Sequence, residues 1–215
     1  MIVYTLIRAK RKTAAIHIRP DATLEVRAPL KMPKRDIDAF VASKEPWIRA
    51  HLEAARERNA RKTAFALGYD GELLLRGKSY PIVDARFGFP PKLTSEQLKA
   101  AAIMMYKAHA REHISARVAH FAPIMGVTPA TVKINGAKTR WGSCSALGNL
   151  NFSWRLIMAE DSAIDYVVVH ELAHLRQMNH SPRFWAVVAD IFPDYRERQK
   201  RIKALQLRLS TEDWG

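Results

Sequence analysis

VVVHELAH, residues 167–174, is the stretch that decides how this chain folds. Successive residues of an α-helix are rotated by about 100°, so His170, Glu171 and His174 fall within one arc of about 100°. The opposite side of the same helix presents valine and leucine side chains. The pattern predicts a helix that continues to about Met178, is packed on one side and presents two imidazoles and a carboxylate to a cavity on the other.

Two imidazoles one helical turn apart can share a metal ion, and His180 follows six residues after His174. A catalytic zinc site normally has three protein ligands and keeps a fourth position for water. Asn179 is a residue type that adopts the left-handed conformation at helix ends, and Ser181-Pro182 is typical of a new helix start. We therefore expect the chain to turn back here, and we predict Zn2+ as cofactor with His170, His174 and His180 as ligands.

Glu171 has a defined task beside such a metal. Zinc lowers the pKa of a bound water to near 7, and an adjacent carboxylate can take the proton and pass it to a leaving group. We predict Glu171 as the catalytic general base. Asp165 and Asp190 are candidates for orienting a ligand histidine.

Blocks on both sides of this helix resemble a known family. They read RWGSC at 140–144, GNLNFSWRLI at 148–157, DYVVVHELAH at 165–174 and NHS at 179–181, with Phe184-Trp185 beyond. Together they resemble the YgjP-like metallopeptidase domain, a zincin family related to the SprT-like proteases. The resemblance implies a zincin-like α+β fold with a small β-sheet beside an active-site helix, zinc bound by His170, His174 and His180, and Glu171 as the base.

A second histidine-rich stretch competes with this site. His109-Ala110-Arg111-Glu112-His113 fits the inverted zinc motif H-x-x-E-H, and His120 lies further along the same helical face. The motif is short and stands outside the family blocks, so we rank it below the site at His170.

The charge of the chain is unevenly distributed. Lysine and arginine total 35 against 21 acidic residues, a net charge of +14. Residues 1–158 carry 27 of the basic and 12 of the acidic side chains, whereas residues 159–215 carry 8 and 9. A polyanion such as nucleic acid or a nucleotide would therefore dock on the basic region before Ala159.

The order of patterns along the chain suggests two parts. Three short β-branched stretches at 3–8, 14–18 and 23–28 predict a β-meander, and two helices follow, one opening at Pro33 and one spanning Pro46 to Arg61. A proline- and glycine-rich loop at 87–91 is the expected seam. We predict a basic amino-terminal β/α part over 1–92 and a zincin-like metallopeptidase domain over 93–215. Within the latter, Leu150–Trp154 is expected to be an edge strand that holds an extended peptide.

Cys144 is the single cysteine, which excludes an intramolecular disulfide framework. The short apolar run before Arg8 lacks the order of a secretory signal, and no window reaches the roughly 18 apolar residues of a membrane-spanning helix. These features predict a cytoplasmic protein without a membrane partner.

The function that we predict is that of a zinc-dependent metallopeptidase acting on peptides or proteins. One alternative keeps the metal and makes the chain a nucleotide pyrophosphohydrolase, because the basic charge suits phosphoanhydrides. The other is a nucleic-acid-associated zinc-binding module without catalysis, although structural zinc usually takes four protein ligands.

Overall fold

The computed structural model describes residues 2–215, and Met1 lies outside this description. The described chain forms two compact units. The first comprises the chain up to Phe65 together with Leu209–Asp213 and Gly215, and the second comprises Ala66–Arg208 with Trp214. From the sequence we predict a domain boundary after residue 92. The division into compact units does not test this boundary, which stays a prediction.

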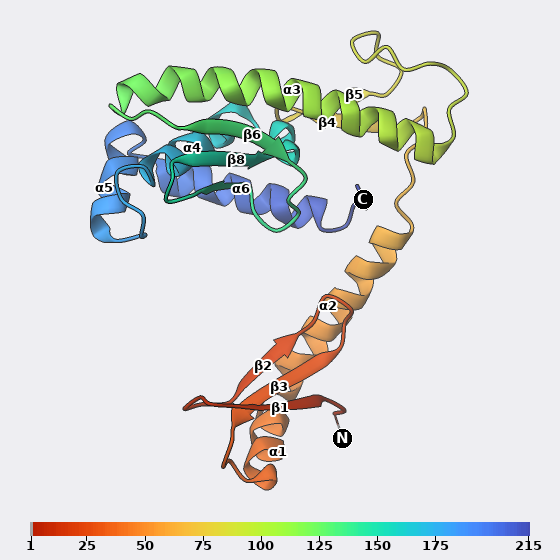
Figure 1. Ribbon diagram of the computed structural model, residues 1–215. Helices are drawn as coiled ribbons and strands as arrows, with labels where there is room; N and C mark the ends of the chain where they lie inside the picture. The colour runs from red at the N-terminus through yellow and green to blue at the C-terminus, as the bar shows by residue number, and fades with distance from the viewer. Residues whose placement is uncertain (1) are drawn as a thin grey trace. The chain divides into compact units, whose positions relative to one another are not determined.

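The first unit consists of three strands and two helices (Figure 1). They are β1 (Thr5–Ala9), β2 (Ala15–Ile18), β3 (Leu24–Pro29), α1 (Lys34–Ser43) and α2 (Glu45–Thr63). Alternate side chains of β3, among them Val26 and Ala28, form a buried core with Ile37 of α1 and Ile48 of α2. Because side chains of a strand alternate between its two faces, the helices cover one face of this sheet.

The sheet of the first unit has the order β1-β3-β2, with β1 parallel and β2 antiparallel to β3. The three expected strands are present, but a meander would pair each strand with the next. Arg8 contributes to the difference, because its guanidinium donates hydrogen bonds to the carbonyls of Pro29, Leu30 and Met32. These bonds fix the end of β1 beside the end of β3, which leaves β3 in the centre.

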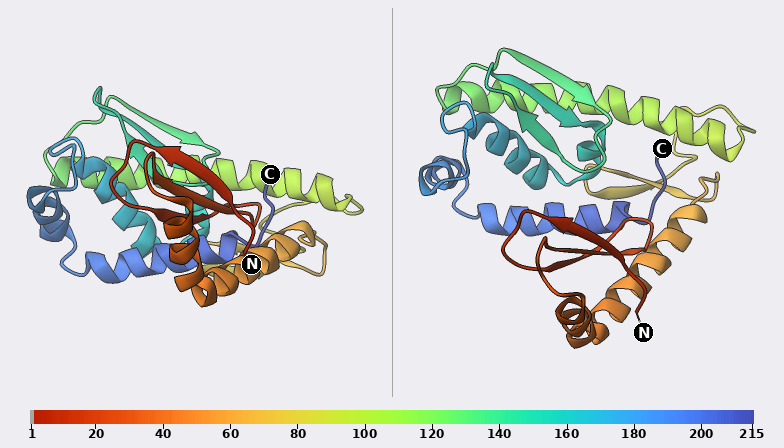
Figure 2. Two further views of the ribbon diagram at one scale, coloured as in Figure 1. Left: turned by 90° about the horizontal axis from the view of Figure 1, so that it is seen from below. Right: turned by 60° about the horizontal axis from the view of Figure 1, so that its bottom comes forward.

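The second unit is larger and contains all the predicted site residues. Its elements are β4 (Glu72–Leu75), β5 (Lys78–Pro81), α3 (Ser95–Ile124), β6 (Thr131–Asn135), β7 (Gly142–Cys144), β8 (Asn149–Ser153), the 3₁₀ helix η1 (Trp154–Met158), α4 (Asp161–Ala173), α5 (Pro182–Ile191) and α6 (Tyr195–Leu209). The long helix α3 packs against α4 and η1. It runs along β6, as the ribbon views show (Figures 1 and 2).

The sheet beside α4 has the order β6-β8-β7. β8 is therefore the central strand, paired in parallel with β6 and antiparallel with β7. The expectation that Leu150–Trp154 forms a free edge is wrong, because its backbone groups are used on both sides. β7 lies at the edge instead and packs against α4.

The helix α4 is the buried centre of the second unit. Val168, Val169 and Leu172 are completely buried, which agrees with the apolar character of VVVHELAH. Its first half is joined to α3 by a bidentate ion pair, in which Arg117 Nε and Nη2 lie 2.6 and 2.9 Å from the carboxylate oxygens of Asp165. The predicted α+β architecture, with a small sheet beside this helix, is confirmed.

Among residues 2–215, no helix combines the length with the apolar character that a crossing of the bilayer demands.

Candidate metal centre

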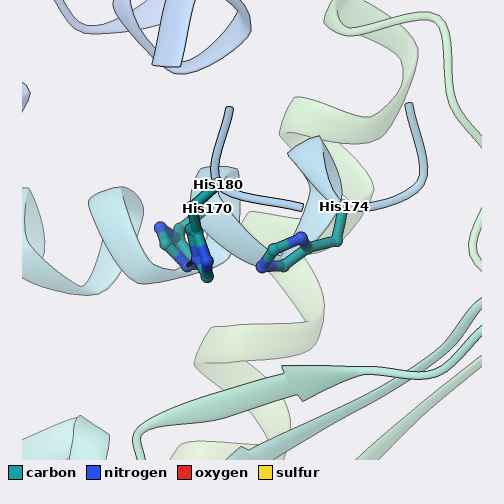
Figure 3. Close-up of side chains that lie close together, drawn as sticks. All are labelled: His170, His174 and His180. Atoms are coloured by element: carbon teal, nitrogen blue, oxygen red, sulfur yellow. Dashed lines mark hydrogen bonds between the residues drawn. The ribbon is translucent and has the colours of Figure 1, made fainter. Parts of the chain in front are cut away.

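Three imidazoles converge at the end of α4. One nitrogen each from His170, His174 and His180 lies within 4.8 Å of the other two. The Nε2 atoms of His170 and His180 are 3.0 Å apart, and Figure 3 shows the His174 ring pointing toward this pair. Among residues 2–215 this is the one group of three or more potential metal ligands.

A tight chain reversal brings His180 to the other two histidines. We expected the helix to continue to about Met178, but α4 ends at Ala173. Beyond it, the amides of Leu175 and Arg176 donate to carbonyls three residues earlier, which is the tighter 3₁₀ pattern. The expected left-handed conformation at Asn179 is absent, since the described non-glycine residues with positive φ lie elsewhere in the chain.

The next helix begins immediately after His180. The Ser181 hydroxyl accepts a hydrogen bond from the amide of Phe184, and Pro182 occupies the first turn of α5, as expected for a helix start. Phe184 is completely buried. Its ring centroid lies 4.9, 4.6 and 4.7 Å from the centroids of His170, His174 and His180, so one aromatic ring restricts all three imidazoles.

Two of the three imidazoles, His170 and His174, are held in the neutral form that a metal requires. Burial, together with the neighbouring His174 and His180, lowers the pKa of His170 to about 3. Burial also lowers the pKa of His174. Metal ligation needs deprotonated imidazole nitrogens, so these shifts favour metal binding at neutral pH.

The donor set and spacing fit a zinc ion. Three imidazoles are the ligand set of one common type of catalytic zinc site. Nitrogens 2.0–2.1 Å from a tetrahedral zinc are about 3.3 Å apart, close to the 3.0 Å between His170 Nε2 and His180 Nε2. The His174 Nδ1 atom lies 3.3 Å from the carbonyl oxygen of Gln177, which leaves Nε2 as the nitrogen facing the centre. The Gln177 carbonyl is thus the group that orients the His174 ring, a role for which Asp165 and Asp190 were candidates. Asp165 pairs with Arg117 instead.

Glu171 lies next to the histidine group and is buried. Only 6% of its surface is exposed, and this burial raises the pKa of its carboxyl to about 7, with the charge of Arg140 acting in the opposite direction. Its side chain lies against the backbone of β7, where a Cβ atom built on Gly142 would be 2.6 Å from Glu171 Oε1. The site thus contains a carboxyl group that can exchange a proton near neutral pH.

The competing motif on α3 does not form a metal site in this structure. His113 Nε2 lies 3.3 Å from the Asp161 carboxylate, which also receives two hydrogen bonds from Arg76. His109 and His120 do not join it in a group of ligands within residues 2–215. The helical spacing placed these residues on one face, but His113 belongs to an ion-pair cluster at the start of α4.

Two contributors to the site were missed from the sequence. Gly142 lies in the RWGSC block, whose glycine could have signalled a close approach of backbone to another group. The contact of Phe184 with all three imidazoles follows only from the turn after α4.

Solved structures and a family model are similar to parts of this chain. The structure is similar to the crystal structure of the metallopeptidase zymogen abylysin from Pyrococcus abyssi, with 27% identity, a TM-score of 0.40, and coverage of 42% of this chain and 92% of that chain. For the metallopeptidase zymogen jannalysin from Methanocaldococcus jannaschii the identity is 17%, the TM-score 0.36, and the coverage 45% and 92%. A search of curated proteins gave no match. The sequence model described as "YgjP-like, metallopeptidase domain" matches residues 12–205, so the chain belongs to the YgjP-like metallopeptidase family.

Proposed function

We propose that this metallohydrolase is a zinc peptidase in which His170, His174 and His180 bind the ion and Glu171 is the general base. The observation that carries the proposal is the convergence of three imidazole nitrogens within 4.8 Å, with a buried carboxyl group on the adjacent residue of the same helix. All four residues belong to the second compact unit.

The chemistry divides between the ion and the protein. A bound zinc ion polarises a carbonyl and lowers the pKa of water to near 7. Glu171 accepts a proton from the attacking water and returns it to the leaving amine. The close backbone of Gly142 restricts where the Glu171 carboxylate can lie.

The sheet offers a place for the peptide backbone. β7 is an edge strand of the order β6-β8-β7, and it packs against α4. An extended peptide can add to such an edge by backbone hydrogen bonds, and Gly142 at the start of β7 brings that edge next to Glu171. We infer that the substrate is a peptide or an extended protein segment bound along β7.

The alternatives have less support. A structural zinc site usually has four protein ligands, whereas the group found within residues 2–215 has three. Binding of nucleotides or nucleic acids through the basic region stays a prediction. A cytoplasmic location of the protein also stays a prediction, and the presence of a single thiol, that of Cys144, favours it.

Metal analysis and one isosteric variant test the proposal. Purified protein is expected to contain one zinc ion per chain, and His180→Ala is expected to lose it. Glu171→Gln should keep the zinc and lose hydrolysis of unfolded protein substrates by a factor of 100 or more. Full activity of Glu171→Gln would overturn the assigned role of Glu171, and hydrolysis of nucleoside triphosphates alone would favour the nucleotide alternative.

A further inference from the structure

A cavity of about 340 Å³ opens beside Glu171 and His170. Three parts of the second unit line it: the segment leading into β7, the face of α4 that carries Glu171, and α6. Since Glu171 is itself part of the wall, a group that fills the cavity lies in contact with the proposed general base.

Apolar side chains from all three parts form the wall. Trp141 comes from the segment before β7, Val167 from α4 and Ile202 from α6. Val167 and Ile202 are 4% and 6% exposed, so their positions are fixed by packing. Polar side chains from α6, such as Gln199 and Lys203, complete the lining. An apolar wall with a few polar groups is typical of ligand sites.

We propose that this cavity binds a large apolar side chain, of the leucine or phenylalanine class, from the substrate residue beside the scissile bond. The proposal rests on the proposed function, because it places the substrate backbone at Glu171. The cavity has the volume of about ten water molecules, and a large apolar side chain would release several of them at a favourable free energy.

Other side chains fit this cavity less well. An uncharged polar side chain would lose hydrogen bonds to water that Trp141, Val167 and Ile202 cannot replace. A small side chain such as alanine would release fewer water molecules than leucine or phenylalanine would.

Binding to Glu171→Gln tests the inference without requiring hydrolysis. The probes are glycine-serine decapeptides with one central leucine, phenylalanine or alanine, titrated calorimetrically in a zinc-containing buffer. Leucine and phenylalanine peptides are expected to bind at least about tenfold more tightly than the alanine peptide. Equal affinity for the leucine and alanine peptides would overturn the proposal.

A matched pair of variants locates the effect in this cavity. Thr139 is exposed and lines the cavity, so Thr139→Trp fills it from its open side with little risk to folding. Lys138 is equally exposed but is outside the lining, so Lys138→Trp is the control. In the Glu171→Gln background, Thr139→Trp is expected to abolish the preference for leucine and Lys138→Trp to retain it. If both variants retain the preference, the side chain binds elsewhere.

Hydrolysis of the same peptides by the unmodified chain separates this inference from the proposed function. Selective binding of the leucine peptide without cleavage would contradict the peptidase assignment and leave the pocket supported. Cleavage that requires Glu171 but is indifferent to the central side chain would contradict the pocket alone.

Discussion

Replacing Gly142 with alanine should uncouple zinc binding from catalysis. A methyl group at this position would lie 2.6 Å from both Cγ and Oε1 of Glu171 and 2.7 Å from its Cδ. Carbon atoms in ordinary contact are about 3.5 Å apart, so Glu171 must move by about 1 Å. β7 cannot easily move instead, because Gly142 is paired with Phe152 of the central strand.

The size of the effect follows from this displacement. A misplacement of about 1 Å in a catalytic group costs about 100-fold in rate, or about 2.7 kcal/mol of transition-state stabilisation. Glu171 is only 6% exposed, so the surrounding atoms resist relaxation. The three atoms nearest the new methyl all belong to Glu171, and zinc content should therefore be unchanged.

The assay is kcat/KM on a cleaved peptide, measured together with zinc stoichiometry. Gly136→Ala is the matched control, because its methyl would have a single neighbour within 4 Å, Trp154 Nε1 at an ordinary 3.8 Å. In a Glu171→Ala background, which lacks the clashing Cγ, Cδ and Oε1 atoms, Gly142→Ala should reduce the residual kcat/KM by much less than 100-fold. Wild-type kcat/KM in zinc-loaded Gly142→Ala would refute the reasoning, and so would a further 100-fold loss in the Glu171→Ala background.

Further perturbations have equally definite expected outcomes. Zinc at 100 times its Kd should stabilise the chain by about 2.7 kcal/mol, seen as a higher thermal midpoint than with a chelator; an equal shift in His180→Ala would argue against ligation by that residue. Trp214 is 6% exposed and packs edge-on against two aromatic rings, so Trp214→Ala should lower the free energy of unfolding by about 3–5 kcal/mol in urea titrations, and a loss below 1 kcal/mol would contradict this packing role. The hydrogen bond and charge of Arg76 hold the pKa of Asp161 below its ordinary value of 3.8. This carboxylate therefore contributes stability above pH 3.8 that is lost as the pH falls through its lower folded-state pKa, and Asp161→Asn should lose less stability between pH 5 and about pH 2 than the unmodified chain does.

Local patterns predicted the helix α4 and the histidines it carries. The helical spacing of apolar and polar residues in VVVHELAH is a property of neighbouring residues, and the buried valines of α4 agree with it. The end of the helix was predicted less well, since α4 stops at Ala173 and tight turns follow. Helix ends depend on hydrogen bonds that compete within one turn, and apolar spacing does not report them.

Strand pairing was predicted only in part. The stretches that form β1, β2 and β3 were recognised, but their order β1-β3-β2 depends on contacts such as those of Arg8 with the end of β3. The central position of β8 likewise depends on partners before and after it in the chain. Pairing between strands is a non-local property that the composition of a single strand does not contain.

The sequence by itself determined the family, the α+β class and the candidate ligands His170, His174 and His180, because their spacing acts through one helix and the turn after it. Only the tertiary structure decided that Gly142 limits the position of Glu171 and that α6 closes a cavity beside it. Both contacts join residues far apart in the chain, and they arise from the packing of β7 and α6 around α4 rather than from any periodicity in the sequence.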